Sequence, residues 1–194
     1  MSITKAGKKI LATTAAIAIA VTTGAFSSNG ATAAPAPQSG GTIVFLEHNP
    51  RLDDLDPTRI YTGRDIAFVT SYFIRTLVSF KHTSGPSSTD LVPDLATNTG
   101  VPSNNAKTWK FTLRPGVTFE DGKPITCEDV RYGASRVFAQ DVLPDGPTYL
   151  ISWLDTGKVE YPGPYKATKE EQAAYDKAVT CSKDNRTITF NLKQ

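Results

Sequence analysis

The middle of the chain places a strand, two turns and a helix start in immediate succession, and this order restricts the fold more than any other feature. Residues Trp109 to Arg114 alternate between apolar and polar side chains, the pattern of a half-buried strand. Two glycine-containing turns follow, with a short apolar run between them. Thr126 and Asp129 then have the spacing of a capping box, so a helix is predicted to begin here and run to about Ala139.

Weaker signals predict elements on both sides of this segment. Short length and β-branched residues predict a buried strand at Thr42 to Leu46. Apolar spacings of three and four predict a helix from Asp65 to Phe80, with its aromatic stripe in the core. Thr168 to Glu171 is a second capping box that opens a helix to about Val179. A proline- and glycine-rich loop is predicted at 141–167, and a last strand at Thr187 to Leu192. This mixed order indicates an α/β or α+β class.

The N-terminus has the organisation of a secretory signal peptide. Three lysines, the only charges in the first 46 residues, precede an apolar run from Ile10 to about Phe26, and Ala31-Thr32-Ala33 fits the small-x-small cleavage rule. The alternative is a membrane anchor or a buried helix. A membrane span needs ~20 strongly apolar residues, and this run is shorter and rich in Ala and Thr. A cleaved signal over residues 1–33 is the favoured interpretation.

We therefore expect the exported protein to begin at or near Ala34. No cysteine lies near the cleavage site, so an anchor through an N-terminal lipidated Cys is not expected. The intact mass of the exported protein measures this start, and an exported form that keeps Met1 would contradict it.

Charge and cysteine content limit the partners and suggest the compartment. Without the three signal lysines the chain has 18 basic and 19 acidic residues, and no basic stripe indicates nucleic acid. Cys127 and Cys181 are the only cysteines. In an oxidising compartment they favour one disulfide, which could contribute about 4 kcal/mol by the chain-entropy estimate. Two separate buried thiols remain the alternative.

The sequence contains few groups suited to catalysis or metal binding. His48 and His82 are far apart and lack neighbours at ligand spacing, and no nucleophile, phosphate or dinucleotide motif is present. The cluster Asp53, Asp54 and Asp56 lacks the glycine and distal glutamate of a calcium loop, so a solvated loop is expected. No cofactor or metal is predicted, and binding is favoured over catalysis.

Four segments, in order, resemble one known family. They are Gly40 to Val44, Leu55-Asp56-Pro57, Leu91 to Ala96, and Thr108 to Val130 with Arg136 downstream. The fourth is the most specific. Together they resemble the family 5 solute-binding proteins of ABC transporters, the oligopeptide and dipeptide binders, over about residues 40–194. Cys127 departs from the small residue usual at its position, which together with Cys181 suggests a lineage-specific bridge.

The resemblance implies a periplasmic-binding-protein-like type II fold of class α/β, with two lobes, a cleft and an extra domain. Family members are much longer than this chain, so an incomplete fold is expected. The implied parts are a signal peptide (1–33), a flexible linker (34–41), the start of lobe one (42–60), the extra domain (61–185) and a return strand (186–194). The chain ends inside a strand-like pattern, so either the strand is terminal or the chain is cut short.

The resemblance also implies a function and a site. It predicts a non-enzymatic, monomeric protein in the periplasm or on the extracellular face of the bacterial membrane, which binds a peptide or a related small solute. Its partners would be an ABC permease and the associated ATPase. Trp109, Phe111 and Asp129 are expected to hold the fold without touching ligand. A secreted hydrolase fragment and a stand-alone extracellular interaction module remain alternatives, and adjacent permease and ATPase genes would favour the first interpretation. The residues expected to line the ligand cleft are Tyr61, Thr62, Gly63 and Arg64.

Overall fold

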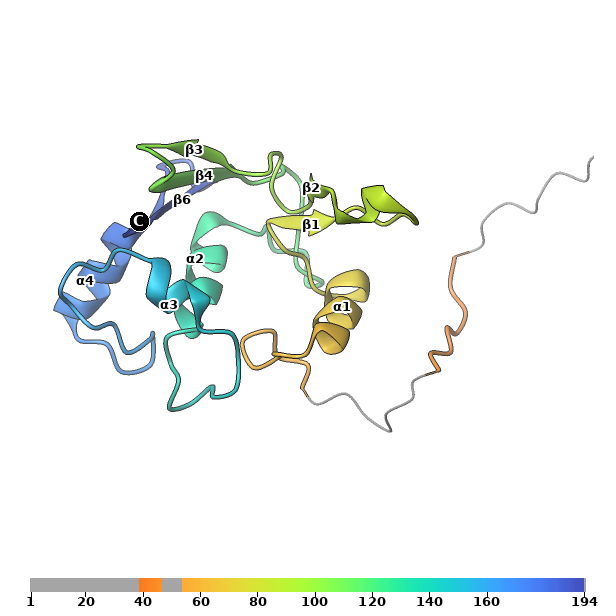
Figure 1. Ribbon diagram of the computed structural model, residues 1–194, viewed down its shortest axis with the longest axis horizontal. Coiled ribbons are helices and arrows are strands. Elements are labelled where there is room, and N and C mark those ends of the chain that lie inside the picture. The colour runs from red at the N-terminus through yellow and green to blue at the C-terminus, as the bar shows by residue number, and fades with distance from the viewer. Residues whose placement is uncertain (1–38, 47–53, 194) are drawn as a thin grey trace, which may run out of the picture. The chain divides into compact units, whose positions relative to one another are not determined.

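The computed structural model describes residues 39–46 and 54–193 (Figure 1). The chain divides into two units, Met1–Phe45 and Leu46–Gln194, and the helices and strands of the described residues all belong to the second. None of these helices combines the length and apolar character that a bilayer span requires. In chain order the elements are α1 (Gly63–Tyr72), β1 (Val78–Phe80), a 3-10 helix (Pro86–Thr89), β2 (Leu91–Pro93), β3 (Val101–Ser103), β4 (Thr108–Thr112), α2 (Cys127–Arg136), α3 (Tyr149–Trp153), α4 (Lys169–Ala178), β5 (Val179–Cys181) and β6 (Thr187–Asn191).

The larger sheet has four antiparallel strands in the order β3-β4-β6-β5. The predicted strand at Trp109 to Arg114 is confirmed as β4, and the predicted last strand is confirmed as β6. These two strands pair along their whole length, with Phe111 opposite Ile188. Alternation places Ile188 on the buried face while Lys110 stays exposed. A separate two-stranded sheet joins β1 to β2.

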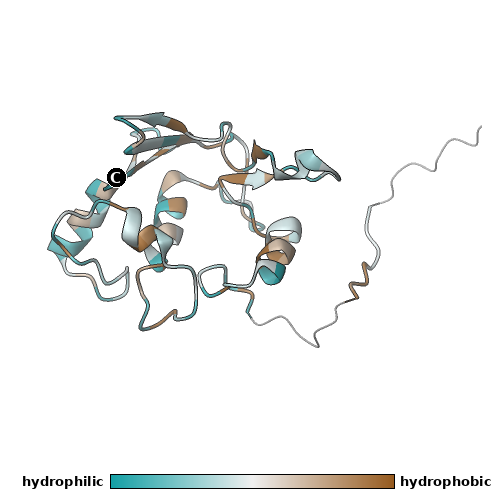
Figure 2. Cartoon of the chain, viewed as in Figure 1, coloured by the Kyte–Doolittle hydropathy of each residue, from teal (hydrophilic) through white to brown (hydrophobic). Residues whose placement is uncertain are grey.

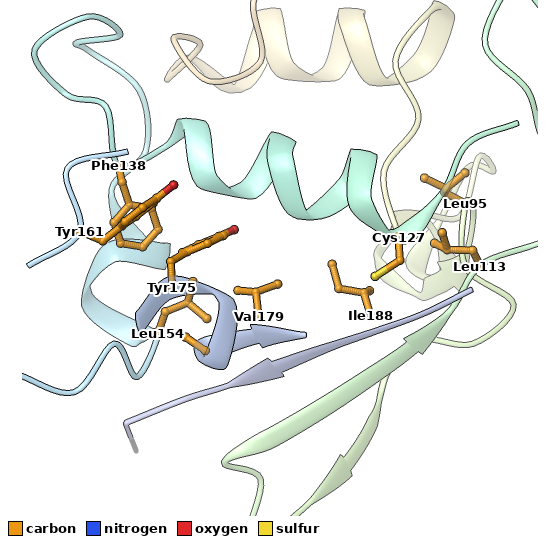
Figure 3. Packing of buried hydrophobic residues seen from close by; sticks show 10 residues of the cluster. Leu95, Leu113, Cys127, Phe138, Leu154, Tyr161, Tyr175, Val179 and Ile188 are labelled. Carbon is orange, nitrogen blue, oxygen red and sulfur yellow. The ribbon is translucent and has the colours of Figure 1, made fainter. Parts of the chain in front are cut away.

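The core lies between one face of this sheet and the helices α2 and α4, which both pack against β5 and β6 (Figure 3). Aromatic rings fill one end of the core: Tyr161 stacks on Tyr175 with ring centroids 4.5 Å apart, and Phe138 meets both rings edge-on. The Tyr175 hydroxyl donates a hydrogen bond to the Arg131 carbonyl oxygen at 2.7 Å, so its one polar group is satisfied. Aliphatic side chains fill the rest of the cluster, among them Leu95, Leu113, Leu154, Val179 and Ile188.

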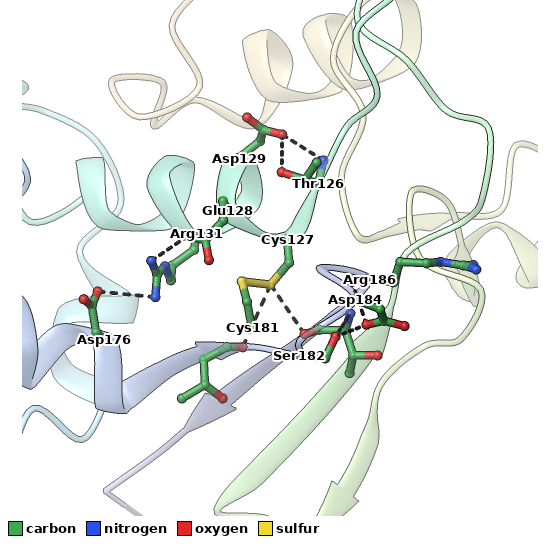
Figure 4. Close-up of a disulfide and its surroundings, with 12 residues drawn as sticks. Thr126, Cys127, Glu128, Asp129, Arg131, Asp176, Cys181, Ser182, Asp184 and Arg186 are labelled. Atoms are coloured by element: carbon green, nitrogen blue, oxygen red, sulfur yellow. Dashed lines mark hydrogen bonds and ion pairs between the residues drawn. A yellow bond between two sulfur atoms is a disulfide. The ribbon is translucent and has the colours of Figure 1, made fainter.

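Both predicted capping boxes are present. The Thr126 backbone N–H and hydroxyl donate to Asp129 Oδ2 at 2.8 and 2.6 Å (Figure 4). The Thr168 N–H donates to the Glu171 carboxylate at 2.6 Å, and the Thr168 hydroxyl accepts from the Glu171 N–H at 3.3 Å. α2 ends at Arg136, slightly before the predicted end. The next turn is tightened by i to i−3 hydrogen bonds, as is common at helix ends.

The predicted disulfide between Cys127 and Cys181 is formed. Its Cα–Cα distance of 5.7 Å lies in the usual range for a bridge. Figure 4 shows the bridge joining the first turn of α2 to β5. Cys127 is fully buried in the core cluster, so the bridge fixes the start of α2 to the sheet.

The prediction of one helix from Asp65 to Phe80 is wrong in its second half. α1 ends at Tyr72, and the segment after it becomes β1, which pairs with β2. Asp94, next to β2, accepts the Thr76 backbone N–H at 3.1 Å. Asp94 thus accepts the Thr76 N–H, which in a continued helix would have donated to a carbonyl oxygen of the preceding turn.

The predicted aromatic core stripe of this segment is also mostly wrong. Val69 is buried, as expected, but Tyr72, Phe73 and Phe80 each keep more than half of their surface exposed. Apolar periodicity predicts which residues share a helix face, and the end of the helix at Tyr72 removes that shared face.

Two further predictions are corrected. Thr42 to Leu46 forms no strand and is exposed, and strand-like composition alone does not make a strand without a neighbouring strand to pair with. The predicted loop at 141–167 contains the short helix α3. The predicted signal peptide (1–33), most of the linker (34–41) and Asp53 lie outside the described residues, and the domain boundaries stay predictions.

Candidate ligand-binding segment

The four predicted ligand residues lie at the start of α1: Tyr61 precedes the helix, Thr62 is its N-cap, and Gly63 and Arg64 are its first two residues. Thr62 is the N-cap of α1, and its hydroxyl accepts the Asp65 backbone N–H at 3.4 Å. Gly63 is the first residue of the helix, and a Cβ at this position would meet open space. The local sequence explains this start, because a threonine N-cap followed by an acidic first turn favours a helix N-terminus.

The two charged or aromatic members of the segment differ in accessibility. The Arg64 guanidinium Nε donates to Asp65 Oδ1 at 2.7 Å, and the Asp65 carboxylate is almost fully buried. The Tyr61 side chain is 62% exposed. Of these two residues, Tyr61 therefore offers the more accessible side chain.

Tyr61 belongs to an exposed aromatic group that the sequence interpretation missed. Its hydroxyl lies 3.3 Å from the hydroxyl of Tyr149, 88 residues later in the chain. The Tyr149 ring stacks on Trp153, with centroids 5.8 Å apart and planes at 26°. The hydrogen bond with Tyr61 raises the pKa of the Tyr149 phenol. Two aromatics four residues apart within a proline- and glycine-rich stretch were the available signal for α3.

The residues just before Tyr61 are held firmly. Ile60 and Thr58 are buried. Gly146 lies directly against the Thr58 carbonyl, and a Cβ at position 146 would be 1.8 Å from that oxygen. Only glycine allows this close approach. The loop before α3 therefore packs directly against the segment that precedes the predicted ligand residues.

An ion pair anchors the same segment from the other side. Arg136 Nη2 and Nη1 donate to Asp56 Oδ2 and Oδ1 at 2.5 and 3.3 Å, and both side chains are about three-quarters buried. The expectation that the aspartate cluster is simply solvated is therefore wrong for Asp56. The ion pair also assigns a structural role to Asp56 and Arg136, which the family resemblance had identified without a role.

The pKa of Asp56 reflects this environment. Burial acts to raise it, but hydrogen bonds from Arg136 and Thr58 outweigh burial, so the pKa is lowered below its ordinary value. A carboxyl whose folded-state pKa is lowered adds stability above its unfolded pKa, and this stability is lost as the pH falls through the folded value. The anchor is thus present at neutral pH and weakens in acid.

A second feature of the surface is a broad apolar groove of about 1220 Å³. It is bounded by β4 and β6, by α2 and α3, and by the segment from Phe73 to Val78. Figure 2 shows hydrophobic segments on α2, α3 and β1. Trp109 and Phe111, expected to hold the fold, both line this groove, and Phe111 also packs against the core cluster. Within 54–193 no cluster of His, Cys, Asp and Glu is arranged to hold a metal ion.

Comparison with known proteins identifies the family. Residues 90–194, more than half of the chain, match the family described as "Bacterial extracellular solute-binding proteins, family 5 Middle". The chain therefore belongs to the family 5 extracellular solute-binding proteins, and the expected fold class, an incomplete α/β fold of the periplasmic-binding-protein-like type II, is confirmed.

Individual relatives agree with this assignment. The chain is 32% identical over 103 residues to the probable D,D-dipeptide-binding periplasmic protein DdpA of Escherichia coli strain K12, a match covering 48% of this chain and 20% of that protein. The solved structure of clavulanic acid biosynthesis oligopeptide binding protein 2 is 40% identical with a TM-score of 0.66, covering 74% of this chain and 25% of that one.

A more distant neighbour supports the fold alone. The Escherichia coli murein tripeptide binding protein MppA is 24% identical with a TM-score of 0.50, over 73% of this chain and 25% of that one. The chain thus spans about a quarter of the length of these solved structures.

Proposed function

We propose that this chain is part of the extracellular substrate-binding component of an ABC importer, which binds peptides or a related small solute and delivers them to a membrane permease. The observation that carries the proposal is the likeness to a solved oligopeptide-binding protein, at 40% identity over 74% of the chain. Membership of a family of solute-binding proteins supports a binding role and not an enzymatic one.

The chemistry of the candidate segment suits a peptide backbone. The Tyr61 and Tyr149 hydroxyls lie side by side and exposed. One of them donates to the other, so the pair offers a ligand one O–H donor together with acceptor oxygens. A peptide offers matching carbonyl oxygens and N–H groups along its main chain. Recognition through the main chain reads no side chain and therefore tolerates many peptide sequences. In this proposal Tyr61 to Arg64 form one wall of the cleft, with Tyr149 beside them.

The remaining parts of the proposal follow from the same function. The protein would act as a monomer in the periplasm or at the extracellular face of the membrane, without a lipid anchor on an N-terminal Cys. Ligand would shift an equilibrium between open and closed lobes, and the closed form would dock on the permease that works with its ATPase. No cofactor and no nucleic acid take part.

The proposal predicts that the 194-residue chain alone binds peptide poorly, whereas a longer form with the rest of the family fold binds it. A cleft ligand is usually enclosed over most of its surface. The costs of association and ordering, several kcal/mol, remain when only one wall is present. Isothermal titration of a peptide mixture against both forms measures the difference.

Matched tyrosine variants of the longer form locate the site. Tyr61→Phe and Tyr149→Phe each remove one hydroxyl of the pair and should weaken binding several-fold. Tyr72→Phe removes another exposed hydroxyl, in the last turn of α1, and should change nothing. Tight binding by the 194-residue chain would instead favour a stand-alone interaction module, and hydrolysis of the peptides during the titration would favour the hydrolase.

A further inference from the structure

Arg136 is the meeting point of three segments that are far apart in the sequence. It lies in the last turn of α2, and its two Nη atoms hold the Asp56 carboxylate. Its third nitrogen, Nε, donates to the Tyr165 hydroxyl at 3.1 Å. The planar guanidinium therefore uses one edge for the carboxylate and another for the phenol. Contacts from two edges of one planar group fix both the orientation of the Asp56 carboxylate and its distance from Arg136, which a single ammonium group cannot do.

The helix that carries Arg136, α2, is held firmly in place. α2 is tied to the sheet at its first residue by the disulfide between Cys127 and Cys181, and the Thr126–Asp129 capping box closes its first turn. Ser135, directly before Arg136, is buried. Arg136 thus projects from an element that is anchored to the core.

The partner of Arg136, Asp56, lies in the turn that leads to the predicted ligand residues. Asp56 Oδ1 also accepts the backbone N–H and the hydroxyl of Thr58, at 3.0 and 2.6 Å. The Asp56 carbonyl accepts the Arg59 N–H at 2.9 Å, which closes the turn. Two residues later the chain reaches Tyr61. The carboxylate that Arg136 holds is therefore the centre of the turn from which the segment starts.

We propose that Arg136 is a positioning residue for peptide binding: through Asp56 it fixes the turn that presents Tyr61 to Arg64 to the ligand. The inference rests on the proposed function and adds to it a residue that does not touch the peptide. Ile60 and Gly146 also hold this stretch, but by packing. The Arg136–Asp56 contact is the polar restraint that sets the direction of the turn.

Arg136→Gln and Arg136→Lys in the longer form test the proposal by peptide titration. Arg136→Gln should weaken peptide affinity about tenfold. Arg136→Lys keeps the charge without the fork and should lie between Arg136→Gln and the unchanged protein. Arg75→Gln is the matched control, because Arg75 makes a similar ion pair with Asp94, away from the segment. An Arg136→Gln affinity within twofold of the unchanged protein, or an equal loss in Arg75→Gln, overturns the proposal.

Amide hydrogen exchange on the 194-residue chain gives a readout that does not need peptide binding. Arg136→Gln should speed exchange at the Thr58 and Arg59 amides about tenfold while the amides of β4 and β6 keep their rates. Tyr165→Phe, which removes the Nε contact and leaves the Arg136–Asp56 pair in place, gives a milder variant if Arg136→Gln folds poorly, and should speed the same amides to a smaller extent. If the unchanged longer form binds no peptide, the proposed function fails, and these exchange rates still decide whether Arg136 positions the turn. Unchanged exchange in both variants overturns the inference.

Discussion

Reduction of the disulfide between Cys127 and Cys181 should lower the free energy of unfolding by about 4 kcal/mol. The bridge closes a loop between residues 54 positions apart, and the chain-entropy estimate for a loop of this length gives that magnitude. The loop includes α2, α3 and α4, so the reduced unfolded chain gains freedom over more than a quarter of its length. Urea unfolding followed by tryptophan fluorescence, with and without reductant, measures the change.

The variant Cys127→Ala/Cys181→Ala is the matched control for this prediction. It removes the bridge and both sulfur atoms, so its stability should be independent of reductant and close to that of the reduced protein. Thiol counting on unfolded, unreduced protein should find no free thiol. Equal stability of the oxidised and reduced protein, or two free thiols in the unreduced one, would contradict a stabilising bridge.

Replacing Ile188 by alanine should lower the free energy of unfolding by about 3 kcal/mol, within the usual range for removing most of a buried aliphatic side chain. Ile188 is fully buried in β6, opposite Phe111 on one side and Cys181 on the other. All three belong to the core or pack against it, so the cavity would have rigid walls and little room to collapse. Urea unfolding of the oxidised protein measures the loss.

Lys110→Ala is the control for this second prediction. Lys110 lies on the paired strand β4, next to the position opposite Ile188, but its side chain is exposed. The control should change stability by less than about 0.5 kcal/mol, as expected for a surface position. Similar losses in the two variants would show that strand propensity, and not core packing, dominates this part of the sheet.

Elements with strong local signals were predictable from the sequence. The alternation in β4 and β6 and the capping boxes of α2 and α4 require only a few neighbouring residues, and the structure confirms all four. The reason is physical: side-chain alternation has a period of two residues, and a capping box joins residues three apart. The disulfide was predictable for a different reason, because a chain with two cysteines has only one possible intramolecular pairing.

Elements that depend on distant partners were not predictable in this way. The segment after Tyr72 has helical periodicity, but β2 and Asp94 provide backbone partners that make β1 a strand. The apolar run at Thr42 to Leu46 has strand composition, yet it forms no strand. A strand also needs a neighbouring strand to pair with, and composition does not specify one. In both cases the outcome depends on whether a distant segment provides backbone hydrogen-bond partners, and the local sequence does not specify this.

The candidate site shows the same division. The sequence by itself determined the strand and helix starts of the core, the family resemblance and the presence of a helix next to Tyr61 and Thr62. Only the tertiary structure decided what surrounds that segment: Tyr149 comes from 88 residues away, and Arg136 reaches Asp56 across 80 residues. Contacts over such separations depend on how the whole chain packs, and no periodicity or capping pattern in either segment specifies its partner.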